Sequence, residues 1–344
     1  MRRRPAVGPA IVVGTLWLAA SPAAADPAKP GDYRSTVTAV TPVSAGVVAE
    51  VVGGDAFLSL TVDSEQEVTV LGYENEPYIR FAADGTVAVN QRSPASWINE
   101  DRFGATEAPA DADAQAPPRW EEVGSGGEWA WHDHRIHWMV PDSPPGVGAD
   151  GLVFEWAVPI DVDGRAVDVQ GRLVREEPTA PWPWVLIGAV VAGGLVGVGW
   201  VVRERRRAVA VLAAIGGLVA GGGALAATVG EAVVLPPGAD TGWLPLVVAA
   251  VAVGAGVAAA VTVIGRWSAA VARVATLVAA ACAGWSAVLR LPVLWEPVLV
   301  GGLPEPLDRA VTAIALAGAA GAAWLIVGGG RSPGRSVPAA ITES

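Results

Sequence analysis

Residues 181–207 read PWPWVLIGAVVAGGLVGVGWVVRERRR. About 20 consecutive apolar residues are enough for a helix to cross the hydrocarbon core of a bilayer. The run begins with tryptophans, whose rings favour the membrane–water interface, and it ends with arginines, which favour the cytoplasmic side. This stretch therefore predicts a transmembrane helix whose C-terminal end lies in the cytoplasm.

Four more stretches of similar length and composition follow the first. Arg266 comes directly after the third of the five stretches, and Arg331 and Arg335 come after the fifth. This arginine bias places the same ends in the cytoplasm as the first stretch does. We therefore expect a helical region at residues 182–330 and a cytoplasmic tail at residues 331–344. The five predicted spans are residues 182–202, 208–229, 243–264, 268–289 and 310–327.

The start of the chain has the features of a secretory signal peptide. Three arginines at residues 2–4 precede an apolar run from Ala6 to Ala20, and small residues follow at 23–25. A basic start, an apolar run and an Ala-x-Ala cleavage site are the three parts of such a signal. We predict a signal peptide at residues 1–25 and export of the domain that follows. The expected location is the cell membrane, as a multi-pass protein with its N-terminal domain outside the cytoplasm.

Residues 26–181 form an acidic region between the signal and the first span. The region holds 27 of the 34 acidic residues and 10 of the 23 basic ones, which is a local net charge of −17. Because nucleic-acid phosphates require a basic face, we expect no nucleic-acid partner. The only cysteine, Cys282, lies in a predicted span, so the acidic region has no cysteine for a disulfide or a thiolate metal site.

Period-two alternation of apolar residues runs through this acidic region. Runs rich in β-branched and aromatic residues predict eight strands, and Asp84-Gly85 and Asp163-Gly164 favour tight hairpin turns. The predicted fold class is an exported all-β sandwich of the Ig-like type, followed by an α-helical transmembrane bundle of five spans. Residues 93–127 are expected to form a long surface excursion. The predicted strands are residues 47–52, 57–62, 67–71, 78–82, 86–90, 129–140, 152–160 and 167–174.

All three histidines of the chain and its only internal methionine fall within the segment HDHRIHWM, residues 132–139. Imidazole and thioether are ligands that copper prefers, and imidazole alone also suits zinc or nickel. We therefore predict a metal site, with copper as the favoured ion, formed by His132, His134, His137 and Met139. On a regular strand the first two would face one side and the last two the other. A site that uses all four would then require a bulge.

Two other interpretations of the histidine segment remain open. The histidines could be structural residues that donate hydrogen bonds to carboxylates, which would make the domain a structural or protein-interaction module of the cell envelope. They could also sense pH, because histidine titrates near neutral pH. The segment Gly72–Phe81 carries Glu74 and Glu76 and is predicted to form a strand, a turn and a strand. Its carboxylates could line the rim of the same site.

The predicted spans contain few groups that could carry out chemistry. Arg273 is their only ionisable residue apart from Cys282, and proton or ion pathways use intramembrane carboxylates or histidines. The bundle is therefore predicted to be an anchor, scaffold or subunit. No hydrolase elbow, phosphate loop or zinc-protease motif is present, so we expect no enzyme activity.

The expected partners follow from these predictions. The bundle requires a lipid bilayer, and a copper site of this kind requires a metal donor or acceptor protein. The small-residue spacings Gly193 to Gly197 and Gly217 to Gly221 allow close helix packing and also allow self-association into a homo-oligomer.

The last predicted hairpin, Phe154–Arg165 followed by Gly171–Leu173, resembles the closing hairpin of CopC-like copper-resistance domains. This resemblance implies a CopC-like exported β-sandwich and a link to copper. In that family the turn reads Asp-Gly-His, and the histidine binds Cu(II) together with the mature N-terminus. Asp163 and Gly164 match this pattern, but Arg165 replaces the histidine, so the copper site of the family is not carried over. The overall plan of the chain also resembles a group of uncharacterised actinobacterial membrane proteins.

Overall fold

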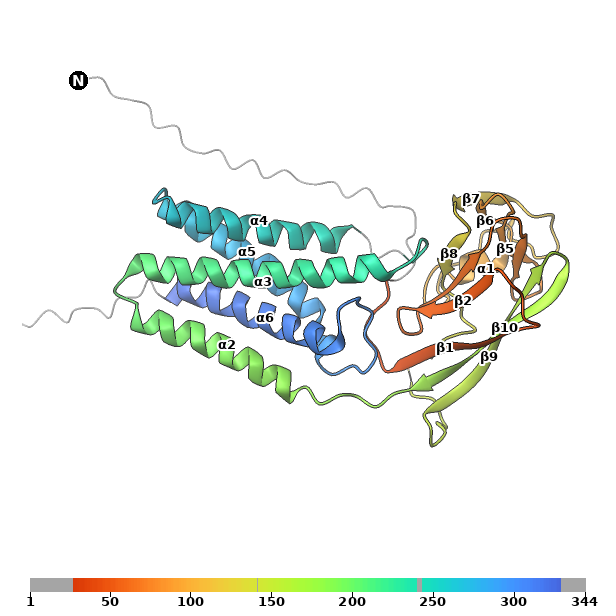
Figure 1. The fold of residues 1–344 in the computed structure, drawn as a ribbon, viewed down its shortest axis with the longest axis horizontal. Helices are drawn as coiled ribbons and strands as arrows, with labels where there is room; N and C mark the ends of the chain where they lie inside the picture. The colour runs from red at the N-terminus through yellow and green to blue at the C-terminus, as the bar shows by residue number, and fades with distance from the viewer. Residues whose placement is uncertain (1–26, 141, 240–242, 329–344) are drawn as a thin grey trace, which may run out of the picture.

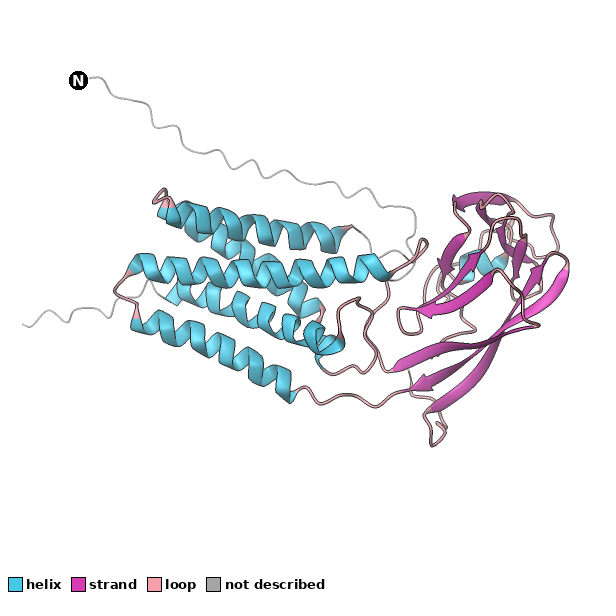
Figure 2. Ribbon diagram, viewed as in Figure 1, coloured by secondary structure: helices cyan, strands magenta, loops and turns pink. Residues whose placement is uncertain are grey.

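The computed structural model of the protein describes residues 27–140, 142–239 and 243–328. A β-sheet region at residues 33–175 precedes five long helices that are apolar enough to cross a membrane (Figure 1). Figure 2 shows that strands and long helices occupy separate parts of the molecule. The predicted signal peptide and C-terminal tail lie outside the described residues.

Ten strands form two antiparallel sheets. The larger sheet has the strand order β1-β10-β9-β4-β5-β6-β7, and the smaller has the order β2-β3-β8. Fully buried side chains of both sheets, such as Leu60 in the smaller and Ile79 in the larger, belong to one hydrophobic core. The strands are β1 (Tyr33–Thr41), β2 (Val47–Val52), β3 (Phe57–Val62), β4 (Val68–Leu71), β5 (Pro77–Phe81), β6 (Val87–Asn90), β7 (Trp120–Gly124), β8 (Glu128–Trp131), β9 (Leu152–Val162) and β10 (Arg165–Arg175).

A strand is present at each of the eight predicted places, but one of them is much shorter than predicted. β8 ends at Trp131, and the predicted continuation to Val140 is wrong, because residues 132–140 form a turn and irregular backbone. The carboxylate of Asp133 accepts a hydrogen bond from the backbone N–H of Arg135 (3.1 Å). Such local side-chain bonds compete with the hydrogen bonds of a sheet, which accounts for the early end of the strand.

Two of the observed strands, β1 and β7, were not predicted, and β7 falls in the segment expected to be a surface excursion. That segment also contains the short helix α1 (Pro94–Ile98). The predicted turn at Asp163 and Gly164 is confirmed, because both residues have positive φ angles (51° and 77°) and β9 pairs with β10 directly across them. Asp and Gly tolerate this backbone conformation, which suits a two-residue hairpin.

Five long helices follow the sheets, and α3 and α6 lie at the centre of their bundle, where each packs against several others. Close packing is confirmed at Gly221, where an added Cβ would lie 2.9 Å from the carbonyl carbon of Ala252. Added Cβ atoms at Gly193 and Gly197 would meet nothing within 4 Å in the described part of the chain, so this pair does not pack against another helix. The helices are α2 (Trp182–Val201), α3 (Arg206–Val234), α4 (Leu244–Ile264), α5 (Ala269–Leu289) and α6 (Glu305–Gly328), with a short 3₁₀ helix, η1 (Leu291–Leu294), after α5.

The β-sheet region lies on the end of the bundle that carries the α3–α4 and α5–α6 connections (Figure 1). Phe57 of β3 and Ala239 of the α3–α4 connection belong to one buried apolar cluster at this junction. Four backbone hydrogen bonds cross it: one from Ala130 to Pro237 (2.8 Å), one from Thr179 to Trp295 (2.8 Å), and two that Gly31 and Val298 exchange (3.1 and 3.0 Å). β8, which leads into the histidine segment, is thus bonded directly to the bundle.

Charged side chains are paired at this end of the bundle. Arg290, which follows α5, forms ion pairs with Glu231 of α3 and with Asp308 of α6. Arg309 is buried and donates hydrogen bonds to the backbone carbonyls of Val293 (2.5 Å) and Glu296 (2.8 Å) in the α5–α6 connection. α3 and α6 extend beyond the predicted spans, because these pairings satisfy charges that lie outside those spans.

Candidate metal site in the histidine segment

The three histidines lie next to one another although the segment is not a strand. The ring centres of His134 and His137 are 5.3 Å apart, and those of His132 and His137 are 6.4 Å apart. Two imidazoles that share one tetrahedral ion have ring centres about 5 Å apart, given metal–nitrogen distances near 2 Å. The pair formed by His134 and His137 therefore has a spacing that suits a shared ion.

The arrangement is not a complete metal site. Within the described residues, no group of three or more His, Cys, Asp or Glu side chains is arranged to hold a metal ion. His132 is buried and its ring stacks on Phe57, with ring centres 4.3 Å apart. Met139 is half-buried beyond the turn. The structure thus brings the rings of the three predicted histidines close to one another.

Each histidine has one ring nitrogen bonded to a backbone carbonyl. A carbonyl oxygen only accepts hydrogen bonds, so the bonded nitrogen must carry the proton. In His134 and His137, the other nitrogen keeps its lone pair when the ring is neutral, and metal-binding histidines are commonly oriented by such a bond. The contacts join Nδ1 of His132 to Ala56 (2.6 Å), Nε2 of His134 to Asp101 (2.8 Å) and Nε2 of His137 to Arg102 (3.0 Å).

Of the three histidines, His137 has the most unusual environment. Its side chain is 1% exposed, and its Nδ1 atom is buried with no hydrogen-bond partner among the residues that the structure describes. Burial, together with the nearby guanidinium of Arg102, lowers the pKa of His137 to about 3. The ring is therefore neutral at physiological pH, and neutral imidazole is the form that binds metals.

The lowered pKa of His137 predicts that the apoprotein loses stability in mild acid. The unfolded chain takes up a proton near pH 6.5 and the folded chain only near pH 3, so the contribution is complete above pH 6.5 and is lost as the pH falls toward 3. We expect a loss of about 1 kcal/mol per pH unit below pH 6.5. Thermal unfolding of the full chain in detergent at pH 6.5 and pH 5.5 measures the effect. The His137→Gln variant should lose less, and equal losses in both proteins would contradict the assignment.

A buried ion pair holds the turn between the histidines. Asp133 is fully buried, and both of its oxygens accept hydrogen bonds from the guanidinium of Arg135 (2.7 and 2.6 Å). Burial alone would raise the pKa of Asp133, but the charge and hydrogen bonds of Arg135 hold it below its ordinary value. Trp131 also donates to this carboxylate (3.0 Å). The carboxylate of Asp133 is therefore already bonded to other side chains and is not free to bind a metal ion.

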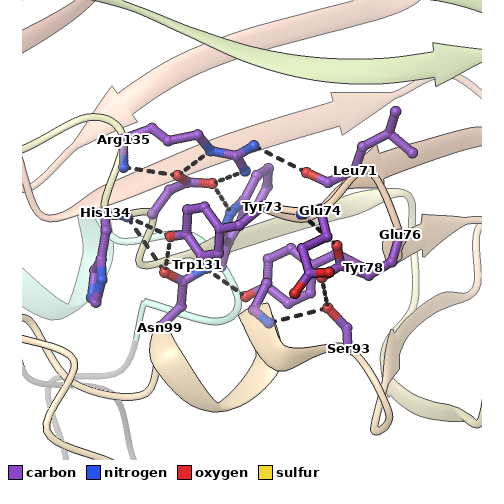
Figure 3. A network of polar contacts seen from close by, with 12 residues as sticks. Leu71, Tyr73, Glu74, Glu76, Tyr78, Ser93, Asn99, Trp131, His134 and Arg135 are labelled. Carbon is purple, nitrogen blue, oxygen red and sulfur yellow. Dashed lines mark hydrogen bonds and ion pairs between the residues drawn. The ribbon is translucent and has the colours of Figure 1, made fainter. Parts of the chain in front are cut away.

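The segment Gly72–Phe81 lies beside the histidine segment (Figure 3). The hydroxyl of Tyr73 accepts a hydrogen bond from the backbone N–H of His134 (3.1 Å) and donates one to Asn99 (2.5 Å). Figure 3 shows the ring of His134 pointing away from Arg135. Glu76, a candidate for the rim of the site, is buried and accepts a hydrogen bond from Ser93 (2.6 Å). The two segments meet, but the carboxylate of Glu76 has a structural partner.

The residues that orient the histidine rings were not among those predicted from the sequence. Asp101 and Arg102, whose carbonyls bind His134 and His137, lie in the segment expected to be a surface excursion. Arg102 is held by a bidentate ion pair with Asp55 (3.0 and 2.5 Å). A backbone carbonyl is the same in every residue, so no pattern of side chains could have identified these positions.

Comparison with protein-family models, with curated proteins and with solved structures found no match.

Proposed function

We propose that the protein is a membrane-anchored, extracytoplasmic metal-binding protein that binds or hands over copper. The observation that carries this proposal is the neutral, buried ring of His137, whose Nδ1 has no hydrogen-bond partner in the described part of the chain and whose ring centre lies 5.3 Å from that of His134. A buried polar atom without a partner is costly, and an ion bound there would remove that cost. His134 and His137 form the core of the proposed site, and His132 and Met139 complete it after local rearrangement.

The position of the site supports a role in handover. β8 leads into the histidine segment and is hydrogen-bonded to the α3–α4 connection, so the site lies close to the end of the helical bundle. The acidic domain around it raises the local concentration of cations. A donor or acceptor protein would exchange the ion through successive replacement of ligands at this position.

The proposal includes a topology and a fold type. The domain is taken to be exported after a signal peptide and to be an Ig-like or CopC-like β-sandwich, which the core shared by the two sheets supports. Arginines such as Arg203 and Arg266 lie at the end of the bundle remote from the β-sheet region. By the positive-inside rule, that end would face the cytoplasm and the β-sheet region would face outward.

A second candidate function is a structural or protein-interaction module of the cell envelope. It is favoured by the backbone carbonyl that each histidine already has as a partner. In this alternative the histidines hold the turn and the neighbouring loop together, and no ion is required.

A metal titration distinguishes the two functions. The full chain in detergent is titrated with Cu(I), Cu(II) and Zn(II) by calorimetry, beside a His134→Gln/His137→Gln variant. We expect binding of one copper ion, weakened at least about tenfold in the variant, because even the groups that orient ligands affect metal affinity by this much. Glu121→Gln/Glu122→Gln removes two exposed carboxylates and controls for unspecific binding to the acidic surface.

Each outcome of the titration favours one of the two candidate functions. Equal copper affinity in the wild type and the histidine variant, or no binding in the wild type, would contradict the metal proposal and favour the envelope module. A loss of affinity in the carboxylate control alone would assign copper binding to the acidic surface.

A further inference from the structure

A cavity of about 620 Å³ lies at the end of the bundle remote from the β-sheet region. Its walls come from the start of α3, the α4–α5 connection, the start of α5 and the end of α6, all of which meet at that end (Figure 1). Segments that are distant in sequence therefore border one cavity that is open to the outside.

The cavity has a strong positive charge. Five arginines line it, and none of the described residues in its walls is acidic. The arginines come from three parts of the chain, so they converge on one space and are not a single run at a helix end. They are Arg203, Arg206, Arg207, Arg266 and Arg273.

These arginines have no anionic partner in the described part of the chain. Arg203 lies over the ring of Trp200 (4.4 Å to the ring centre), and Arg207 donates to the carbonyl of Ile264 (3.3 Å). The ion pairs of the described residues involve other arginines, such as Arg290 at the opposite end of the bundle. Like charges that share a cavity repel one another, so a bound anion would stabilise this arrangement.

Part of the cavity wall is apolar. Val209, Ala272 and Leu325 are buried side chains that line the cavity together with the arginines. A small inorganic anion would fill only the charged part. A ligand with a charged head and an apolar body would contact both parts, as a lipid does when its headgroup lies at the end of a helical bundle.

We propose that this cavity binds a phosphate group, and that the apolar wall favours a phosphate carried by an anionic phospholipid. Arginine recognises phosphate well, because its planar guanidinium donates two parallel hydrogen bonds to the oxygens. Basic pockets between transmembrane helices are suited to anionic headgroups for the same reason. The site is independent of the histidine segment, which lies at the other end of the molecule.

Lipid binding tests the proposal on the full chain. The protein is placed in nanodiscs or mixed micelles that contain phosphatidylglycerol, with phosphatidylcholine as the neutral comparison, and bound lipid is counted by native mass spectrometry. Arg206→Gln/Arg273→Gln removes two of the arginines that line the cavity. We expect phosphatidylglycerol binding to weaken about tenfold in this variant, because hydrogen bonds between charged groups are the strong ones. Arg205→Gln is the matched control, because Arg205 is exposed in the same stretch and does not line the cavity.

A competition arm identifies the source of the phosphate. If phosphatidylglycerol stays bound in millimolar inorganic phosphate, the ligand is the phospholipid. If inorganic phosphate displaces the lipid from the wild type and does not bind the double variant, the site belongs to a soluble phosphate compound. Equal weakening in Arg205→Gln and in the double variant, or no weakening in either, would show diffuse surface charge and overturn the proposal. Arg206→Lys/Arg273→Lys keeps the charge and should restore part of the binding, and a thermal melt of each variant verifies the fold.

Discussion

Replacement of Asp133 by alanine is expected to destabilise the β-sheet region by about 3 to 5 kcal/mol, the cost of breaking a buried ion pair at one partner. Asp133 is fully buried, and Arg135 binds it through two nitrogens. Without the carboxylate, the guanidinium stays in the interior with one remaining hydrogen bond to the carbonyl of Leu71 (3.1 Å). Thermal or denaturant unfolding of the full chain in detergent, followed by tryptophan fluorescence, measures the loss.

A second ion pair provides the matched control. Asp111 and Arg119 are also an aspartate and an arginine at hydrogen-bond distance (2.7 Å), but their side chains are 54% and 50% exposed. Asp111→Ala should cost less than about 1 kcal/mol, as exposed pairs do. The double variant Asp133→Ala/Arg135→Met should recover part of the loss, since it leaves no unpaired charge. Similar small losses for Asp111→Ala and Asp133→Ala would mean that Arg135 finds water when its partner is removed.

The histidine turn shows why part of the site could not be predicted from the sequence. The aromatic and β-branched residues of the run 129–140 favour a strand, and the prediction followed them. Asp133 instead bonds the backbone of Arg135 and ends β8, a local competition that period-two patterns do not register. The clustering of the three histidines in sequence did carry over, because a turn of this length keeps neighbouring residues close in space.

The helical region was more predictable than the sheets, for a physical reason. Each span has to be apolar along its whole length, so composition alone indicates its position. The ends of the helices depended on tertiary pairing, as at Glu231 and Asp308, whose common partner is Arg290. The partners of the sheet edges and the docking of β8 on Pro237 depend on contacts far apart in the chain, which a single sequence does not reveal.

Replacement of Arg290 by alanine is expected to cost the helical bundle about 3 to 5 kcal/mol, because it leaves two carboxylates of α3 and α6 without their cation. Asp308 is 1% exposed, and Glu231 is also largely buried, so neither can recover its lost interaction from water. Arg290 precedes the α5–α6 connection, which is hydrogen-bonded to Gly31 and Thr179 on the β-sheet side of the junction. We therefore expect a lower melting temperature and faster proteolysis at the junction of the two parts.

Arg273→Ala, on the helix α5 that Arg290 follows, is the control, because Arg273 is exposed and makes no ion pair in the described part of the chain. In lipid-free detergent, its effect should stay within about 0.5 kcal/mol, as for surface substitutions in general. In the Arg290→Ala background, Glu231→Gln and Asp308→Asn should return much of the stability, since neutral amides do not require a cation. Failure of this rescue would show that Arg290 acts through the shape of its side chain. If Arg290→Ala loses as little stability as Arg273→Ala, solvent reaches the two carboxylates. A large loss with rescue would establish that charge pairing holds α3, α5 and α6 together where the β-sheet region docks.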